Sequence, residues 1–118
     1  MSRLLKSFTF ALKGIKIYLQ SGGNVFIHLV AGGIVILLGY IFKISSAEWI
    51  VLILCIGMVL GAEALNTAIE ELTNLVSPEY HEQAGKVKDL AAGAVLIISL
   101  MAAIIGFIIF VPKILALL

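Results

Sequence analysis

Three long runs of apolar residues dominate the chain. They cover residues 25–42, 49–65 and 90–111, and none contains Lys or Arg. Each approaches the roughly 20 residues that a helix needs to cross a hydrocarbon core about 30 Å thick. Only helices and closed barrels satisfy their own backbone hydrogen bonds in lipid. The pattern therefore predicts an all-α integral membrane protein, with membrane helices over 25–42, 49–75 and 90–111.

The first 20 residues follow a different pattern. At helical pitch, their apolar side chains fall within an arc of about 100°; they are Leu4, Leu5, Phe8, Leu12, Ile15 and Leu19. The opposite side carries Lys6, Lys13, Lys16 and Gln20. This is the pattern of an amphipathic helix lying on a membrane surface. We expect one domain over 1–118, with a surface helix at 1–20 that the polar segment 21–24 ends.

Composition and charge agree with a membrane protein. Hydrophobic residues make up 62% of the chain and charged residues 13%, whereas soluble domains are nearer half and a quarter. The net charge of +1 excludes polyanion binding through bulk charge. One predicted side of the membrane holds most basic residues, namely Arg3, Lys6, Lys13, Lys16, Lys86 and Lys88, and the other side has Lys43 and Lys113. This bias places the N-terminus and the second loop in the cytoplasm.

A stripe of polar residues continues helically from the second apolar run. Glu63, Asn66, Glu70 and Asn74 are spaced i, i+3, i+7 and i+11, so they share one narrow face of a helix. Glu63 lies about 21 Å along the helix axis from Trp49, which places it inside the membrane near the cytoplasmic edge. An ionisable residue at that depth is costly and marks a functional site by default.

The loop after the stripe carries further polar groups. Ser77 followed by Pro78 predicts the start of a helical turn, and Lys88 and Asp89 open the third span. Acids, amides and lysines therefore converge on one membrane face. Carboxylates beside basic residues suit a magnesium–phosphate complex, and a carboxylate at the lipid edge suits a general base acting on the hydroxyl of an amphiphile.

Other chemistries find little support. The chain contains neither G-x-x-x-x-G-K-[ST] nor G-x-G-x-x-G, and its single cysteine and two histidines lack metal-ligand spacing. His28, at the start of the first span, is interpreted as an interfacial packing residue. Two other functions stay open: a transporter or proton-relay subunit, which also uses an intramembrane acid, and a structural scaffold. Nucleotide binding separates the first from an enzyme that uses a magnesium–phosphate complex, and a scaffold would tolerate Glu63→Gln.

The polar segments resemble the small bacterial membrane kinases of the diacylglycerol kinase and undecaprenol kinase family. The resemblance rests on residues 63–70 (EALNTAIE), 77–81 (SPEYH), 85–89 (GKVKD) and 91–95 (AAGAV), with matching spacing between the blocks. The N-terminal helix is similar to the surface helix of the family. The resemblance covers nearly the whole chain and is most specific from Glu63 to Val95.

The resemblance implies a homotrimer in the bacterial inner membrane, with active sites on the cytoplasmic side that neighbouring subunits share. It implies transfer of the γ-phosphate of ATP to a lipid hydroxyl with Mg²⁺ as cofactor, most simply diacylglycerol giving phosphatidic acid, with undecaprenol as the alternative acceptor. Glu63 matches the catalytic base, Glu70 a magnesium ligand, and Asn66 a residue near the reacting groups. The nucleotide-binding positions correspond to Arg3, Phe10, Glu79, Tyr80, His81, Lys88 and Asp89.

The chain departs from the family before its first span. Gly22 stands where relatives carry an acid that is the second magnesium ligand, Phe26 replaces an Arg, and Asn74 stands where Asp is common. Hard cations gain affinity with ligand charge, so the loss of one carboxylate predicts weaker metal binding. A weakly active or inactive homologue is therefore the rival to an active kinase.

Overall fold

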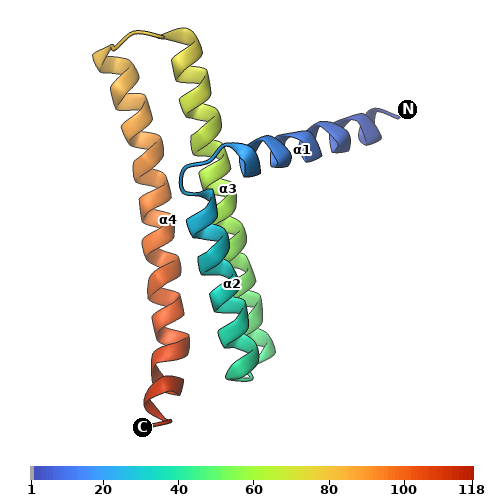
Figure 1. The fold of residues 1–118 in the computed structure, drawn as a ribbon, viewed down its shortest axis with the longest axis vertical. Helices are drawn as coiled ribbons and strands as arrows, with labels where there is room; N and C mark the ends of the chain where they lie inside the picture. The colour runs from blue at the N-terminus through green and yellow to red at the C-terminus, as the bar shows by residue number, and fades with distance from the viewer. Residues whose placement is uncertain (1) are drawn as a thin grey trace.

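The structure is a computed structural model that describes residues 2–118 as four helices joined by short connections (Figure 1). They are α1 (Arg3–Gln20), α2 (Val25–Ile41), α3 (Ser46–Val76) and α4 (Glu82–Leu115). The two long helices, α3 and α4, form an antiparallel hairpin, and α2 runs beside α3. Helix α1 points away from the bundle, so the molecule is flat, with extents of 55 × 43 × 20 Å.

Capping explains where the long helices begin. Helix α3 starts three residues before the predicted span because Ser45 and Glu48 form a reciprocal capping box. Helix α4 starts at Glu82, eight residues before the predicted span, and the His81 side chain accepts a hydrogen bond from the backbone N–H of Gln83. The predicted helical turn at Ser77 is wrong. Its hydroxyl donates to the carbonyl of Glu79, and the chain stays irregular up to His81.

The connection between α1 and α2 is a sharp elbow made of two glycines. Gly22 and Gly23 have φ values of +77° and +63°, a left-handed conformation that costs other residues about 1–2 kcal/mol each. The two helices consequently meet at a bend of 99°. The predicted helix break at 21–24 is present, and the backbone conformation at position 22 favours glycine.

Two helices, α3 and α4, are long and apolar enough to cross a membrane. Helix α2 has 17 residues, which span about 26 Å, and it reaches the required length only when taken together with α1 across the bend. The described part of the chain thus contains two clear candidate spans, and the third, over 25–42, stays a prediction.

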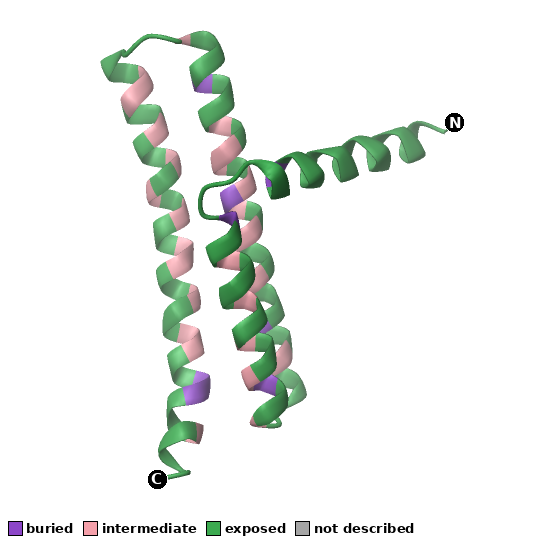
Figure 2. Ribbon diagram, viewed as in Figure 1, coloured by how far each residue is buried: buried purple, intermediate pink, exposed green. Residues whose placement is uncertain are grey.

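Few side chains are buried within the single chain (Figure 2). A small core near the C-terminal end of α4 consists of Ile44, Leu52, Ile109 and Phe110. Most other large apolar residues are exposed along the helices. Such a surface suits a lipid environment or contact with further subunits, because a soluble monomer rarely exposes apolar patches of this extent.

The packing of α2 on α3 at this end depends on Gly39. A Cβ atom at Gly39 would lie 2.6 Å from Cη2 of the Trp49 ring, and that ring also stacks at 5.1 Å between centroids on Tyr40. Close approach of the two helices therefore requires glycine at this position. Across the hairpin, Lys113 Nζ and Glu48 Oε2 form an ion pair at 2.8 Å that joins the same ends of α3 and α4.

Replacing Gly39 by Ala is expected to destabilise the protein by about 1–3 kcal/mol, because overpacking displaces the Trp49 ring. Thermal unfolding in detergent, followed by Trp49 fluorescence, measures this change. Gly33→Ala is the matched control in the same helix, since a Cβ there meets nothing within 4 Å. Equal unfolding temperatures for the two variants would contradict the packing argument.

Candidate active site

Glu63 is buried within the helix bundle and paired with a histidine. Its residue exposure is 8%, and its Oε1 lies 2.7 Å from Nε2 of His28 on α2. The interpretation of His28 as a packing residue is therefore incomplete, since the ring makes a specific polar contact. The sequence could have indicated this contact through the predicted depth of the two residues. Helices α2 and α3 are antiparallel, and His28 and Glu63 both lie near the cytoplasmic edge of their predicted spans.

The surface helix reaches the same point through Tyr18. Tyr18 is the one buried residue of α1, and its hydroxyl has no hydrogen-bond partner among residues 2–118. Burial raises the pKa of Tyr18, and the nearby negative charge of Glu63 raises it further. The phenol is consequently neutral at physiological pH, and the end of α1, the start of α2 and the middle of α3 meet around one carboxylate.

The predicted polar stripe lies on one unbroken helix, because α3 continues without interruption to Val76. One turn beyond Glu63, the Asn66 Nδ2 donates to Glu70 Oε1 at 3.0 Å. The Asn66 Oδ1 is buried and has no protein donor within residues 2–118. Glu70 is exposed. The stripe therefore presents an exposed carboxylate beside an unpartnered amide oxygen.

The far end of the stripe contacts α4. Lys88 Nζ donates to Oδ1 of Asn74, so a cation from the start of α4 lies over the stripe. This contact also joins the cytoplasmic ends predicted for α3 and α4. Asp89 is exposed beside it.

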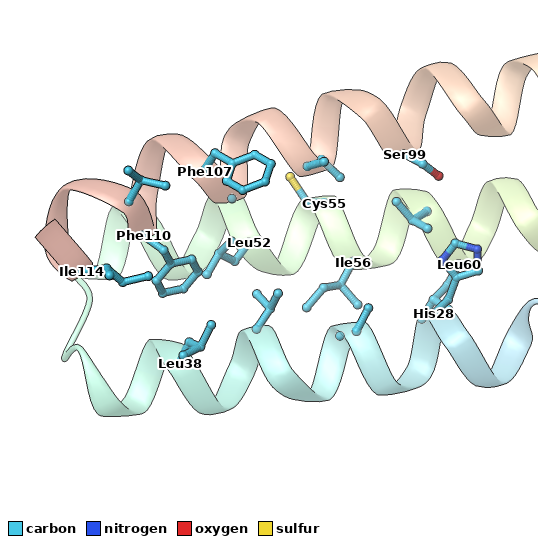
Figure 3. Close-up of a pocket in the computed structure, with 18 residues that line it drawn as sticks. His28, Leu38, Leu52, Cys55, Ile56, Leu60, Ser99, Phe107, Phe110 and Ile114 are labelled. Atoms are coloured by element: carbon cyan, nitrogen blue, oxygen red, sulfur yellow. The ribbon is translucent and has the colours of Figure 1, made fainter.

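An apolar cavity of about 430 Å³ lies between α2, α3 and α4 (Figure 3). Its walls include Gly32 and Leu38 from α2, Leu52 and Cys55 from α3, and Ser99, Phe107 and Phe110 from α4. His28 forms part of its wall at the end opposite Phe110 and Ile114. The cavity thus extends along the bundle to the histidine that contacts Glu63.

Comparison with known proteins identifies the family. The family model described as prokaryotic diacylglycerol kinase matches residues 9–110, which is most of the chain. The chain belongs to the prokaryotic diacylglycerol kinase family. Its members are lipid kinases, and this chain is one of them by sequence.

Similar proteins carry two different names within the prokaryotic diacylglycerol kinase family. An undecaprenol kinase from Bacillus subtilis is 37% identical over 113 residues, covering 96% of this chain and 92% of that protein. A diacylglycerol kinase from Synechocystis is 36% identical over 115 residues, covering 97% of this chain and 66% of that protein. The diacylglycerol kinase of Escherichia coli K12 is 27% identical over 103 residues, with coverage of 87% and 84%.

A lipid kinase requires a place for nucleotide, and the structure distributes the expected nucleotide residues over two regions. Glu79, Tyr80 and His81 lie in the exposed loop between α3 and α4, where Tyr80 is 91% exposed. That loop begins after Val76, about 20 Å along α3 from Glu63. Lys88, near the start of α4, contacts Asn74 of the stripe, so the loop, Lys88 and the far end of the stripe all lie at the connected ends of α3 and α4.

Arg3 and Phe10 lie elsewhere. Helix α1 leads away from the bundle (Figure 1), which puts Arg3 about 22 Å along the axis from Tyr18. Phe10 is 67% exposed and lies beneath the Lys13 ammonium at 5.6 Å. Within one chain, the structure does not bring these two residues to Glu63.

The family implies a metal, and the donors present fit Mg²⁺. This ion prefers oxygen ligands and is commonly held by one or two carboxylates together with water and substrate phosphates. The Glu70 carboxylate and the unpartnered Asn66 Oδ1 are such oxygens. No cluster of three or more His, Cys, Asp or Glu side chains occurs within residues 2–118, so the protein alone offers a sparse site. Gly22 adds no ligand there.

Proposed function

We propose that the chain transfers the γ-phosphate of ATP to the hydroxyl of a membrane lipid, with Glu63 as general base. The observation that carries the proposal is the position of Glu63: it is buried and contacts His28, which forms part of the wall of an apolar cavity. A lipid chain in the cavity would place its polar end beside this carboxylate.

The proposed reaction follows from the roles of these residues. The lipid hydroxyl loses its proton to the Glu63 carboxylate while its oxygen forms a bond to the γ-phosphorus, and the bond from that phosphorus to the β-phosphate oxygen breaks to release ADP. Phosphoryl transfer mainly demands positioning and neutralised charge. Lys88 would supply one cation, and Glu70 with Asn66 would hold Mg²⁺. When bound, this ion neutralises phosphate charge.

The remaining parts of the proposal concern assembly and location. Glu79, Tyr80, His81 and Asp89 would hold the nucleotide together with Arg3 and Phe10. The distance between α1 and the stripe in one chain favours a site that a neighbouring subunit completes, in agreement with the proposed homotrimer. The three apolar runs favour three spans in a bacterial inner membrane, and the bias of the basic residues favours a site on the cytoplasmic side.

The acceptor has two candidates. The family resemblance by itself favours diacylglycerol as the acceptor. The similarity to the Bacillus subtilis undecaprenol kinase, which extends over 92% of that protein, now favours undecaprenol as the first acceptor to test. Both lipids present a hydroxyl at the interface above apolar chains, so the cavity accommodates the chemistry of either.

The test is ADP release by the purified full chain in mixed micelles containing Mg²⁺ and ATP. Undecaprenol and diacylglycerol are offered separately, and phosphorylated lipid is extracted and identified. Turnover that depends on one lipid supports the kinase and names its acceptor. An assembled protein that binds ATP but phosphorylates neither lipid would support the alternative hypothesis of an inactive homologue.

A further inference from the structure

We propose that His28 is a positioning residue for the general base: its Nε2–H holds Oε1 of Glu63, and the other carboxylate oxygen faces the acceptor hydroxyl. This inference rests on the proposed function of Glu63. It assigns His28 a role in the reaction that its interpretation as an interfacial packing residue does not include.

The contact is specific and shielded from water. It joins α2 to α3 over 2.7 Å, and the side chains of His28 and Glu63 are 21% and 11% exposed. Within residues 2–118, His28 is the only side chain that hydrogen-bonds the Glu63 carboxylate. Thr67 binds the backbone carbonyl of Glu63 instead. A carboxylate in apolar surroundings requires such a donor, since an unpaired buried charge is costly.

The geometry links this contact to the acceptor. His28 is part of the cavity wall, and Figure 3 shows its ring at one end of the cavity. One edge of the ring therefore holds the base while the ring itself borders the space for the lipid chain. A residue that orients a base within a few tenths of an ångström affects the rate strongly, because a misplacement of about 1 Å can cost about 10²-fold.

The neighbours of this contact from the other two helices are uncharged. From α1, the neutral Tyr18 lies near Glu63, and α4 contributes Ser99 to the cavity wall. Among these groups, His28 is the one that hydrogen-bonds the Glu63 carboxylate.

Two substitutions separate positioning from simple helix packing. In His28→Leu the donor is lost, and we expect kcat to fall about 10- to 10²-fold with the KM for ATP unchanged. In His28→Gln an amide N–H replaces the imidazole donor, so most of kcat returns. Both are measured with undecaprenol and diacylglycerol micelles, after size-exclusion chromatography establishes assembly.

The outcomes distinguish this inference from the proposed function. Full activity of Glu63→Gln overturns the base and the inference with it. An inactive Glu63→Gln beside a fully active His28→Leu overturns only the role of His28. A kcat of His28→Gln that is as low as that of His28→Leu also overturns it.

If His28→Leu assembles poorly, a second test introduces the same substitution into a Glu63→Asp variant. In Glu63→Asp the carboxylate is withdrawn by one methylene, which breaks the contact with His28. If His28 acts through Glu63, adding His28→Leu to this background lowers kcat less than threefold, whereas a purely structural residue costs the same in both backgrounds. Equal costs would overturn the inference.

Discussion

Replacing Glu63 by Gln is expected to lower kcat by about 10²- to 10⁴-fold, the usual contribution of a positioned general base. The amide keeps nearly the same shape, and its oxygen still accepts a hydrogen bond from His28, so the helices stay packed. The lipid hydroxyl then has no acceptor for its proton. ADP release measures kcat, and fluorescent-nucleotide binding establishes that ATP is still bound.

Glu71→Gln is the matched control for this experiment. Glu71 follows Glu70 on α3 and is exposed, and its carboxylate makes no hydrogen bond to another described residue. Its loss removes the same charge from the same helix. A loss of activity similar to that of Glu63→Gln would point to a general effect of charge and contradict a base at position 63.

Replacing Glu70 by Gln is expected to raise the Mg²⁺ concentration for half-maximal activity by about 10- to 100-fold, since even residues that only support a ligand have effects of this size. The site has few other oxygens: Asn66 Oδ1 is the neighbouring one, and Gly22 supplies none. A magnesium titration of ADP release at saturating ATP measures the change. An unaltered titration curve would exclude Glu70 as a ligand.

Position 22 offers a complementary substitution. Gly22→Glu introduces the carboxylate that the family resemblance implies at this position, but it must adopt φ near +77°, at a cost of about 1–2 kcal/mol. Gly22→Asn is the control, because Asn tolerates this backbone without adding charge. We expect Gly22→Glu to require less Mg²⁺ than Gly22→Asn. Equal requirements would show that the missing acid has no bearing on metal affinity.

The helices were largely predictable from the sequence, whereas their ends were not. Apolar runs reveal the segments that avoid water, but α4 continues outward to Glu82 because helix formation does not stop at the membrane surface. The capping box at Ser45 and Glu48 was readable in principle, since it has a local sequence signature. The choice of His81 over Ser77 as the cap of α4 depends on how the chain turns between the two helices.

The stripe on α3 was predictable because its residues share one helix, and helical spacing determines which of them align. The partners of Glu63 come from elsewhere in the chain. His28 contacts it because α2 packs beside α3. Tyr18 approaches it because the elbow at Gly22 and Gly23 sets the direction of α1. The separation of Arg3 and Phe10 from the stripe likewise follows from this bend, which no local pattern reveals.

The elbow between α1 and α2 also determines how deep Glu63 lies in the membrane. With α1 lying in the membrane plane, as its amphipathic pattern predicts, the right-angled turn fixes the level of Tyr18 and His28, and both residues reach Glu63. In that arrangement, the depth of the Glu63 carboxylate is set by the membrane surface on which α1 lies and not by the thickness of the whole bilayer. An acceptor would then be selected by the depth at which its hydroxyl resides, and the length of its chains would matter little.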